Sequence, residues 1–244
     1  MGLRHDLILR ARRLGIEDRL RDVHGLRSRE SRRDRRDMRH LRLLLSLTLA
    51  EDACCVDVGA NIGAVLREIV GFAPRGRHVA YEPLPELASL LARTFPGVDV
   101  RNAAASDRTG EATFHRVRSR DARSSLDRLD FEDRDLEQIT VAVEDLDSSL
   151  PPDFAPTLVK IDVEGAEEQV LRGAARTLGT HRPIVVLEHN ASARHFGTSS
   201  QTIHAMLTAA GLRVFDIDGN GPYTPDDFDR TASSGRMWTF VAHP

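Results

Sequence analysis

The chain has little lysine, little cysteine and no long apolar run. Its longest stretch of mainly apolar residues, 43–50, is far shorter than the ~20 residues of a transmembrane helix. The N-terminal segment is dotted with arginines instead of carrying the apolar core of a secretory signal. Cys54 and Cys55 are adjacent, so they are poor disulfide partners, and they match no metal-ligand spacing. We therefore expect a cytoplasmic protein with no membrane span.

Positive charge is concentrated at one end of the chain. Of the 34 basic residues, 33 are arginine, and Lys160 is the single lysine. The first 50 residues hold 14 arginines against 7 acids, whereas the rest of the chain is net negative. A basic N-terminal arm on an acidic body predicts contact with an anionic partner, or with a second copy of the chain in a homodimer. A helix with solvated charges is the more ordinary explanation of the same run.

Strand and helix patterns alternate from Ala53 onward, which predicts a mostly parallel sheet with helices on both faces. Before that point we expect amphipathic helices at 3–24, a charged connection or helix start at 27–40 and a helix at 41–49. The seven predicted core strands are 54–58, 78–82, 98–103, 157–162, 184–187, 213–217 and 238–242. The main predicted helices are 62–70, 85–93, 166–178 and 200–211. Segments 111–118 and 139–143 predict a small antiparallel insertion. We therefore expect a basic helical arm, 1–40, and one Rossmann-like α/β domain, 41–244.

The first candidate ligand site is the glycine turn Val56–Gly63, between a strand and a helix. Gly59 lets the chain turn sharply and approach a ligand closely, and Gly63 lets the helix pack tightly on the strand. Dinucleotide-binding turns use G-x-G-x-x-G, a pattern that Ala60–Asn61 breaks. Asp57 places a carboxylate before the turn, which repels phosphate but suits the ammonium end of an amino-acid cofactor. The turn therefore favours S-adenosylmethionine over a nicotinamide dinucleotide. The predicted contacts are Asp57, Gly59, Asn61 and Gly63.

A second carboxylate strengthens that prediction. Glu82 ends the second predicted strand, 19 positions after Gly63, where it can accept hydrogen bonds from both ribose hydroxyls. We expect Leu84 to form an apolar wall for adenine. Asn102 and Ala104 belong to a segment placed to meet the adenine edge through backbone groups. The competing interpretation of Glu82 is a charge that favours the N-terminus of the next helix.

Three segments resemble the FkbM family of methyltransferases: Asp57–Gly63, Asn102–Asp107 and Lys160–Glu167. The similarity runs from about residue 52 to about residue 190. Ser124-Ser125-Leu126 resembles the short serine-leucine element between the family's inserted strands, so Ser124 and Ser125 are candidate substrate residues. The resemblance implies a class I methyltransferase fold and methyl transfer from S-adenosylmethionine to a hydroxyl, often on polyketides, sugars or lipid-linked glycans of bacteria. It does not identify the acceptor, which we expect to be a small molecule or a glycan.

The end of the fourth predicted strand carries charged residues spaced by two. Lys160, Asp162 and Glu164 share one side if the extended conformation persists. A lysine inside a sheet is costly unless it is paired, so we expect an ion pair with Asp162 or Glu188. Two roles stay open for Lys160. It shapes the pocket as a buried ion pair, or it lowers the pKa of the acceptor hydroxyl or takes its proton. Glu164 is a candidate substrate residue.

The fifth predicted strand ends in Glu188-His189-Asn190, beside the fourth. His189 is a candidate general base because histidine titrates near working pH, and a structural histidine is the alternative. Asp162 with Glu188, His189 or Asn190 could also hold a divalent cation, as in catechol-type methyltransferases, although the resemblance requires no metal. The candidate catalytic residues are therefore Lys160, Asp162, Glu188 and His189, with no metal assigned. Asp162 is also a candidate contact of the cofactor.

Functions of different classes compete with methyl transfer to a small molecule. RNA methylation or RNA binding would use the basic arm as its electrostatic footprint. No recognisable RNA module or stripe of stacking aromatics accompanies that arm, and the acidic body argues against a nucleic-acid partner. The arm could instead serve a scaffold, and the α/β pattern would also suit a nucleotide-dependent oxidoreductase.

Overall fold

The structure, a computed structural model, describes residues 29–117, 136–163, 165–190 and 198–244. The chain divides into two compact units, Met1–Leu44 and Leu45–Pro244. Helix α3 (Arg29–Thr48) is continuous, where the sequence predicted a charged connection or helix start over 27–40 and then a helix from Leu41. The predicted helices at 3–24 lie outside the described residues, and a separate arm over 1–40 stays a prediction.

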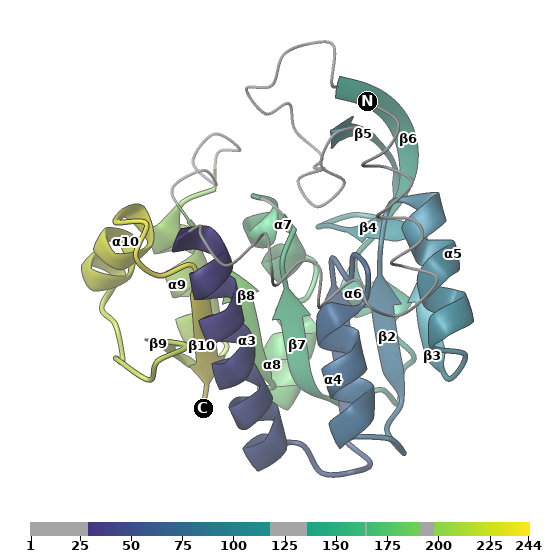
Figure 1. The fold of residues 1–244 in the computed structure, drawn as a ribbon. Helices are drawn as coiled ribbons and strands as arrows, with labels where there is room; N and C mark the ends of the chain where they lie inside the picture. Colours follow the sequence, from purple (N-terminus) through teal and green to yellow (C-terminus); the bar gives the residue numbers. More distant parts are fainter. Residues whose placement is uncertain (1–28, 118–135, 164, 191–197) are drawn as a thin grey trace. The chain divides into compact units, whose positions relative to one another are not determined.

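The larger unit contains a seven-stranded sheet in the order β3-β2-β1-β7-β8-β10-β9 (Figure 1). Its strands are β1 (Cys54–Val58), β2 (His78–Tyr81), β3 (Val98–Arg101), β7 (Pro156–Ile161), β8 (Ile184–Glu188), β9 (Arg213–Asp216) and β10 (Thr239–His243). All pairings are parallel except those of β10, which runs antiparallel to β8 and β9. The predicted mostly parallel α/β fold is confirmed.

The order of the strands reverses between β1 and β7. From β1 the chain passes through α4 (Ala64–Phe72) to β2, whereas from β7 it passes through α7 (Glu167–Arg172) and α8 (Ala175–His181) to β8. Right-handed crossovers in opposite directions place these helices on opposite faces, and Figure 1 shows α4 in front of the strands and α8 behind them. Ligands of open α/β sheets bind beyond the carboxyl ends of the strands at such a reversal. The candidate site therefore lies where β1 and β7 end.

Two charged residues stand inside this otherwise apolar centre. The strands β1, β7 and β8 are buried along most of their length because helices cover both faces, which explains their aliphatic sequences. Asp57 in β1 is 1% exposed and Lys160 in β7 is 6% exposed. The register places them opposite one another in neighbouring strands.

A smaller sheet, in the order β4-β6-β5, follows β3 in the chain. It contains β4 (Ala103–Ala105), β5 (Gly110–Val117) and β6 (Leu136–Glu144), with β5 and β6 antiparallel as the sequence predicted. The third predicted strand, 98–103, divides into β3 and β4 because β4 leaves the main sheet and pairs with β6. One apolar cluster in this region contains Leu84, Ala104, Phe114, Val141 and Val143.

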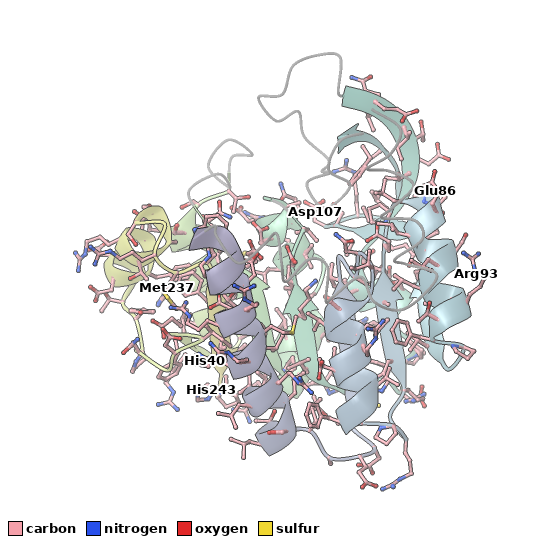
Figure 2. The ribbon with its side chains drawn as sticks, in the orientation of Figure 1. His40, Glu86, Arg93, Asp107, Met237 and His243 are labelled. Carbon is pink, nitrogen blue, oxygen red and sulfur yellow. The ribbon has the colours of Figure 1, made fainter. Side chains whose placement is uncertain are left out.

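The remaining helices are α5 (Pro85–Thr94), α6 (Leu146–Ser149), α9 (Ser200–Ala209) and α10 (Pro225–Ser233). Helix α5 carries Glu86 in its first turn and Arg93 in its last (Figure 2), which suits the helix dipole. Helix α10 was not predicted, although Thr224 at its N-cap accepts a hydrogen bond from the backbone N–H of Asp227.

Candidate active site

The glycine turn after β1 is held against the chain that follows β7. Gly59 has a φ of +73°, and a Cβ there would lie 1.9 Å from the carbonyl oxygen of Asp162. Gly63 has a φ of +81°, and a Cβ there would lie 2.6 Å from the ring of Phe95. Asn61 also adopts a positive φ, of 51°. Glycine is required at 59 and 63 because of both φ and space, and the crowding comes from the protein itself.

Glu82, directly after β2, is fixed beside this turn by two backbone groups. Its Oε2 accepts a hydrogen bond from the N–H of Asn61 at 2.8 Å, and its Oε1 accepts one from the N–H of Leu84 at 2.9 Å. Burial raises the pKa of Glu82, and these two hydrogen bonds oppose the shift. Each carboxylate oxygen has two acceptor positions, so one on each remains for a ligand hydroxyl.

The residues named for the adenine end lie near Glu82 but make protein contacts of their own. The side chain of Leu84 is buried in the apolar cluster that also contains Ala104. Asn102 is exposed, and its Nδ2 donates to the carbonyl oxygens of Glu82 and Pro83, at 3.0 and 2.9 Å. Asn102 therefore holds the turn after β2, and its contact with adenine stays a prediction.

Lys160 lies between two carboxylates and two carbonyl groups. Its Nζ is 3.2 Å from Asp57 Oδ1 and 3.5 Å from Asp162 Oδ2. It also donates to the carbonyl oxygens of Val58 and Gly59, at 3.2 and 2.7 Å. The side chain of Asp57 is fully buried, whereas that of Asp162 is 37% exposed. The predicted pair of Lys160 with Asp162 is present, and Asp57 is a further partner that the sequence analysis missed.

The charges around Lys160 decide its protonation. Burial alone would lower the pKa of Lys160, but the negative charges of Asp57 and Asp162 outweigh burial and raise it. Burial raises the pKa of Asp57, and the Lys160 ammonium opposes that shift. A lysine that takes a proton in catalysis needs a lowered pKa. This geometry therefore favours a permanent ammonium that holds the glycine turn.

Comparison with known proteins shows the family of the chain. A model of the FkbM methyltransferase domain matches residues 57–214, which is more than half of the chain and includes Asp57, Glu82 and Lys160. The chain belongs to the FkbM methyltransferase family.

The similarity to individual relatives is either distant or limited to part of the chain. The structure of methyltransferase FkbM from Methylobacillus flagellatus KT is similar with a TM-score of 0.51 at 20% identity, over 80% of this chain and 44% of that one. The AMB antimetabolite synthetase AmbE of Pseudomonas aeruginosa is 43% identical over 72 residues, which are 28% of this chain and 3% of that protein. The structure of StiE O-MT residues 961–1257 gives a TM-score of 0.47 at 10% identity, over 92% of this chain and 80% of that one. The chain thus spans less than half of the first two proteins.

The candidate base of this FkbM domain is enclosed by protein. His189 directly follows β8 and is 2% exposed. Its Nε2 is 2.9 Å from Ser200 Oγ, its Nδ1 is 3.9 Å from Glu167 Oε2, and its ring stacks on Phe228 with centroids 5.4 Å apart. Glu188 is the half-buried last residue of β8 and adds to the negative charge that acts on Lys160. A direct contact of His189 with an acceptor stays a prediction that this burial opposes.

Several predictions concern residues outside those that the structure describes. Ser124, Ser125 and Glu164 are the three predicted substrate residues, and all lie there. Most of the arm, with its predicted RNA or dimer contacts, also lies there. None of the helices that the structure describes combines the length and the apolar character of a membrane span. The described residues contain no group of three or more His, Cys, Asp or Glu side chains arranged to hold a metal ion.

Proposed function

We propose that this FkbM domain transfers the methyl group of S-adenosylmethionine to a hydroxyl of a small molecule or glycan. The observation that carries the proposal is the fixed carboxylate of Glu82, held by the N–H groups of Asn61 and Leu84 beside the glycine turn. A carboxylate held in this way is ready to accept hydrogen bonds from two neighbouring ribose hydroxyls. Family membership supports methyl transfer, and the resemblance of the three sequence segments supports a hydroxyl acceptor.

The charge of the site also suits this cofactor. Asp57, Glu82 and Asp162 are three carboxylates, and the ammonium of Lys160 contacts two of them. The balance of these four groups is negative, which attracts a ligand that carries a sulfonium and an ammonium and repels a pyrophosphate. Asp57 is fully buried and neutralises Lys160. Its contribution to binding is therefore electrostatic, and Asp162 is the carboxylate of this pair that solvent reaches.

We propose that Asp162 binds the hydroxyl of the acceptor. When bound, S-adenosylmethionine supplies a methyl group on a sulfonium sulfur, which leaves as a neutral thioether. Lys160 stays protonated and His189 is enclosed, so neither is suited to take the proton of the attacking hydroxyl. Asp162 combines a partly exposed carboxylate with a fixed backbone, since its N–H donates to the carbonyl oxygen of Val58 at 3.1 Å. It orients the hydroxyl and accepts its proton.

Calorimetric titration with S-adenosylhomocysteine tests the cofactor site. Removing a charged partner of two hydroxyls costs about 1.5–3 kcal/mol for each hydrogen bond, so Glu82→Ala should weaken binding by at least about 100-fold. Glu86→Ala is the matched control, because Glu86 is an exposed glutamate four residues away in the first turn of α5. Equal affinities of Glu82→Ala and the unaltered protein, or tighter binding of NAD than of S-adenosylhomocysteine, would contradict the proposal.

A second experiment separates the two roles open to Asp162. With an acceptor that the unaltered protein methylates, Asp162→Asn should lower kcat by about 10²–10⁴-fold, the range of general base catalysis. The affinity for S-adenosylhomocysteine should change little. A large loss of that affinity with an unchanged kcat would instead place Asp162 at the amino-acid end of the cofactor. Amine and thiol analogues of the same acceptor test the preference for oxygen.

A further inference from the structure

A buried polar network joins three helix and strand ends next to the candidate site. It contains Glu167, the first residue of α7, His189, directly after β8, and Ser200, the first residue of α9. All three residues are at most 3% exposed. Glu167 Oε1 accepts a hydrogen bond from the N–H of Gly165 at 2.8 Å, and His189 Nε2 lies 2.9 Å from Ser200 Oγ. None of these contacts was predicted from the sequence.

The two atoms at the centre of the network face each other across a distance longer than a hydrogen bond, so their contact is electrostatic. Glu167 Oε2 and His189 Nδ1 are both buried without a hydrogen bond among the described residues, and they face each other at 3.9 Å. Glu167 has only acceptor atoms when ionised, so the proton belongs on His189 Nδ1. The neutral ring then accepts from the hydroxyl of Ser200 at Nε2. The network Ser200–His189–Glu167–Gly165 then has a hydrogen bond at each end and an electrostatic contact at its centre.

The Glu167 end of this network fixes the peptide group of Gly165, close to Asp162. Gly165 has a φ of +111°, its N–H donates to Glu167, and its carbonyl oxygen accepts from Thr198 Oγ1 at 2.7 Å. Three residues earlier, the backbone of Asp162 is held against Val58 and Gly59. The backbone is therefore held at Asp162 and again at Gly165.

We propose that Glu167 is a positioning residue, which with His189 and Ser200 fixes the Gly165 peptide and so the direction in which Asp162 meets the acceptor. This inference rests on the proposed function, since it concerns the acceptor side of the same site. His189 acts through Glu167 and does not touch the acceptor. The order Ser–His–Glu resembles that of hydrolases, but Ser200 is 3% exposed in the first turn of α9 and closed to a substrate.

The protonation of His189 can be measured directly by NMR of ¹⁵N-histidine-labelled protein, with His189→Gln to assign the signals. The expected signature is a neutral ring protonated at Nδ1. In Glu167→Gln the amide oxygen must stay on the Gly165 N–H, so the amide NH₂ faces His189 and the ring proton should move to Nε2. A ring protonated at Nε2 in the unaltered protein, a doubly protonated ring, or no change in Glu167→Gln would overturn the network.

Hydrogen exchange and turnover test what the network does. Glu167→Leu removes the acceptor of the Gly165 N–H, so exchange of that amide should speed up by at least about tenfold, while Glu167→Gln should keep it slow. The kcat of Glu167→Leu should fall at least about tenfold with an unchanged affinity for S-adenosylhomocysteine, and Glu167→Gln should retain most of the kcat.

Glu86→Gln is the control, as another first-turn glutamate, on the outer helix α5 (Figure 2). Faster exchange in Glu167→Leu with a normal kcat would show a merely structural network and refute the positioning role. If the unaltered protein binds no S-adenosylhomocysteine, the proposed function fails instead, and the ¹⁵N and exchange results still decide whether the network exists. Glu167→Gln keeps the test valid if Glu167→Leu does not fold.

Discussion

The buried pair of Lys160 and Asp57 allows a quantitative prediction for Lys160→Met. Methionine matches the length of the lysine stem but has no charge. Asp57 would then be a fully buried carboxylate that has lost its cationic partner. The carbonyl oxygen of Gly59 would also lose the Lys160 donor, while that of Val58 would keep the N–H of Asp162. Removing one partner of a buried pair costs about 3–5 kcal/mol, because an uncompensated charge remains.

The loss should be visible in thermal unfolding. For a domain of this size, 1 kcal/mol shifts the midpoint by about 2–4 °C, so Lys160→Met should melt about 6–20 °C lower. Burial raises the pKa of Asp57, and Lys160 would no longer oppose it. A raised pKa in the folded state gives stability that is complete at low pH and lost as pH rises through that pKa. The deficit should therefore be larger at pH 7.5 than at pH 5.5.

Two further variants separate the buried charge from a general effect of substitution. Asp57→Leu combined with Lys160→Met removes both charges and should recover more than half of the loss, since apolar replacements of buried pairs are often neutral. Arg77→Met breaks the exposed pair with Asp153 and should leave the unfolding midpoint almost unchanged. A double variant no more stable than Lys160→Met, or a deficit independent of pH, would refute the reasoning.

Three other predictions concern stability and reactivity. Gly59→Ala should destabilise the protein by more than about 2 kcal/mol in urea unfolding, because of the positive φ and the clash with a backbone carbonyl. Gly71→Ala, in the exposed part of α4, should instead stabilise it by about 0.5–1 kcal/mol in the same measurement. Burial raises the pKa of Cys55 from 9.0 to about 12, which lowers its thiolate fraction about 1000-fold, so a thiol reagent should label Cys54 and leave Cys55 unmodified until unfolding. Burial also lowers the pKa of His78 below 6.5. The contribution of His78 to stability is therefore complete above pH 6.5 and is lost as pH falls through the lowered pKa. In urea unfolding, the unaltered protein should lose more stability between pH 7.5 and pH 5.5 than His78→Phe does. Equal losses would contradict the assignment to His78.

Much of the fold could be predicted because local pattern and tertiary structure agree there. The strand β8 is aliphatic because helices cover both faces of the sheet, so its burial could be predicted from its own residues. Helix α10 was missed because its apolar stripe is short, even though the capping residue Thr224 and Pro225 mark its start. The break between β3 and β4 could not be predicted, because it depends on pairing with β6, more than thirty residues later.

The site was predictable as a set of residues and less so as a set of contacts. Alternation along an extended chain correctly placed Lys160 and Asp162 on one side. The pairing of Lys160 with Asp57 depends on which strand lies beside β7, a fact of strand order that a class I topology could have supplied. Asn102 and His189 both come after strands end, where alternation no longer fixes the direction of a side chain.

The sequence by itself determined that a glycine turn, a carboxylate after the second strand and a lysine in the fourth meet at one edge of a parallel sheet. Periodicity and the position of glycine are local properties that one segment carries alone. Only the tertiary structure decided which carboxylate is sealed against the lysine and that the histidine faces the interior between α7 and α9. Such contacts depend on burial by segments that are distant in the sequence, and the residues of one segment do not show which other segments will cover it.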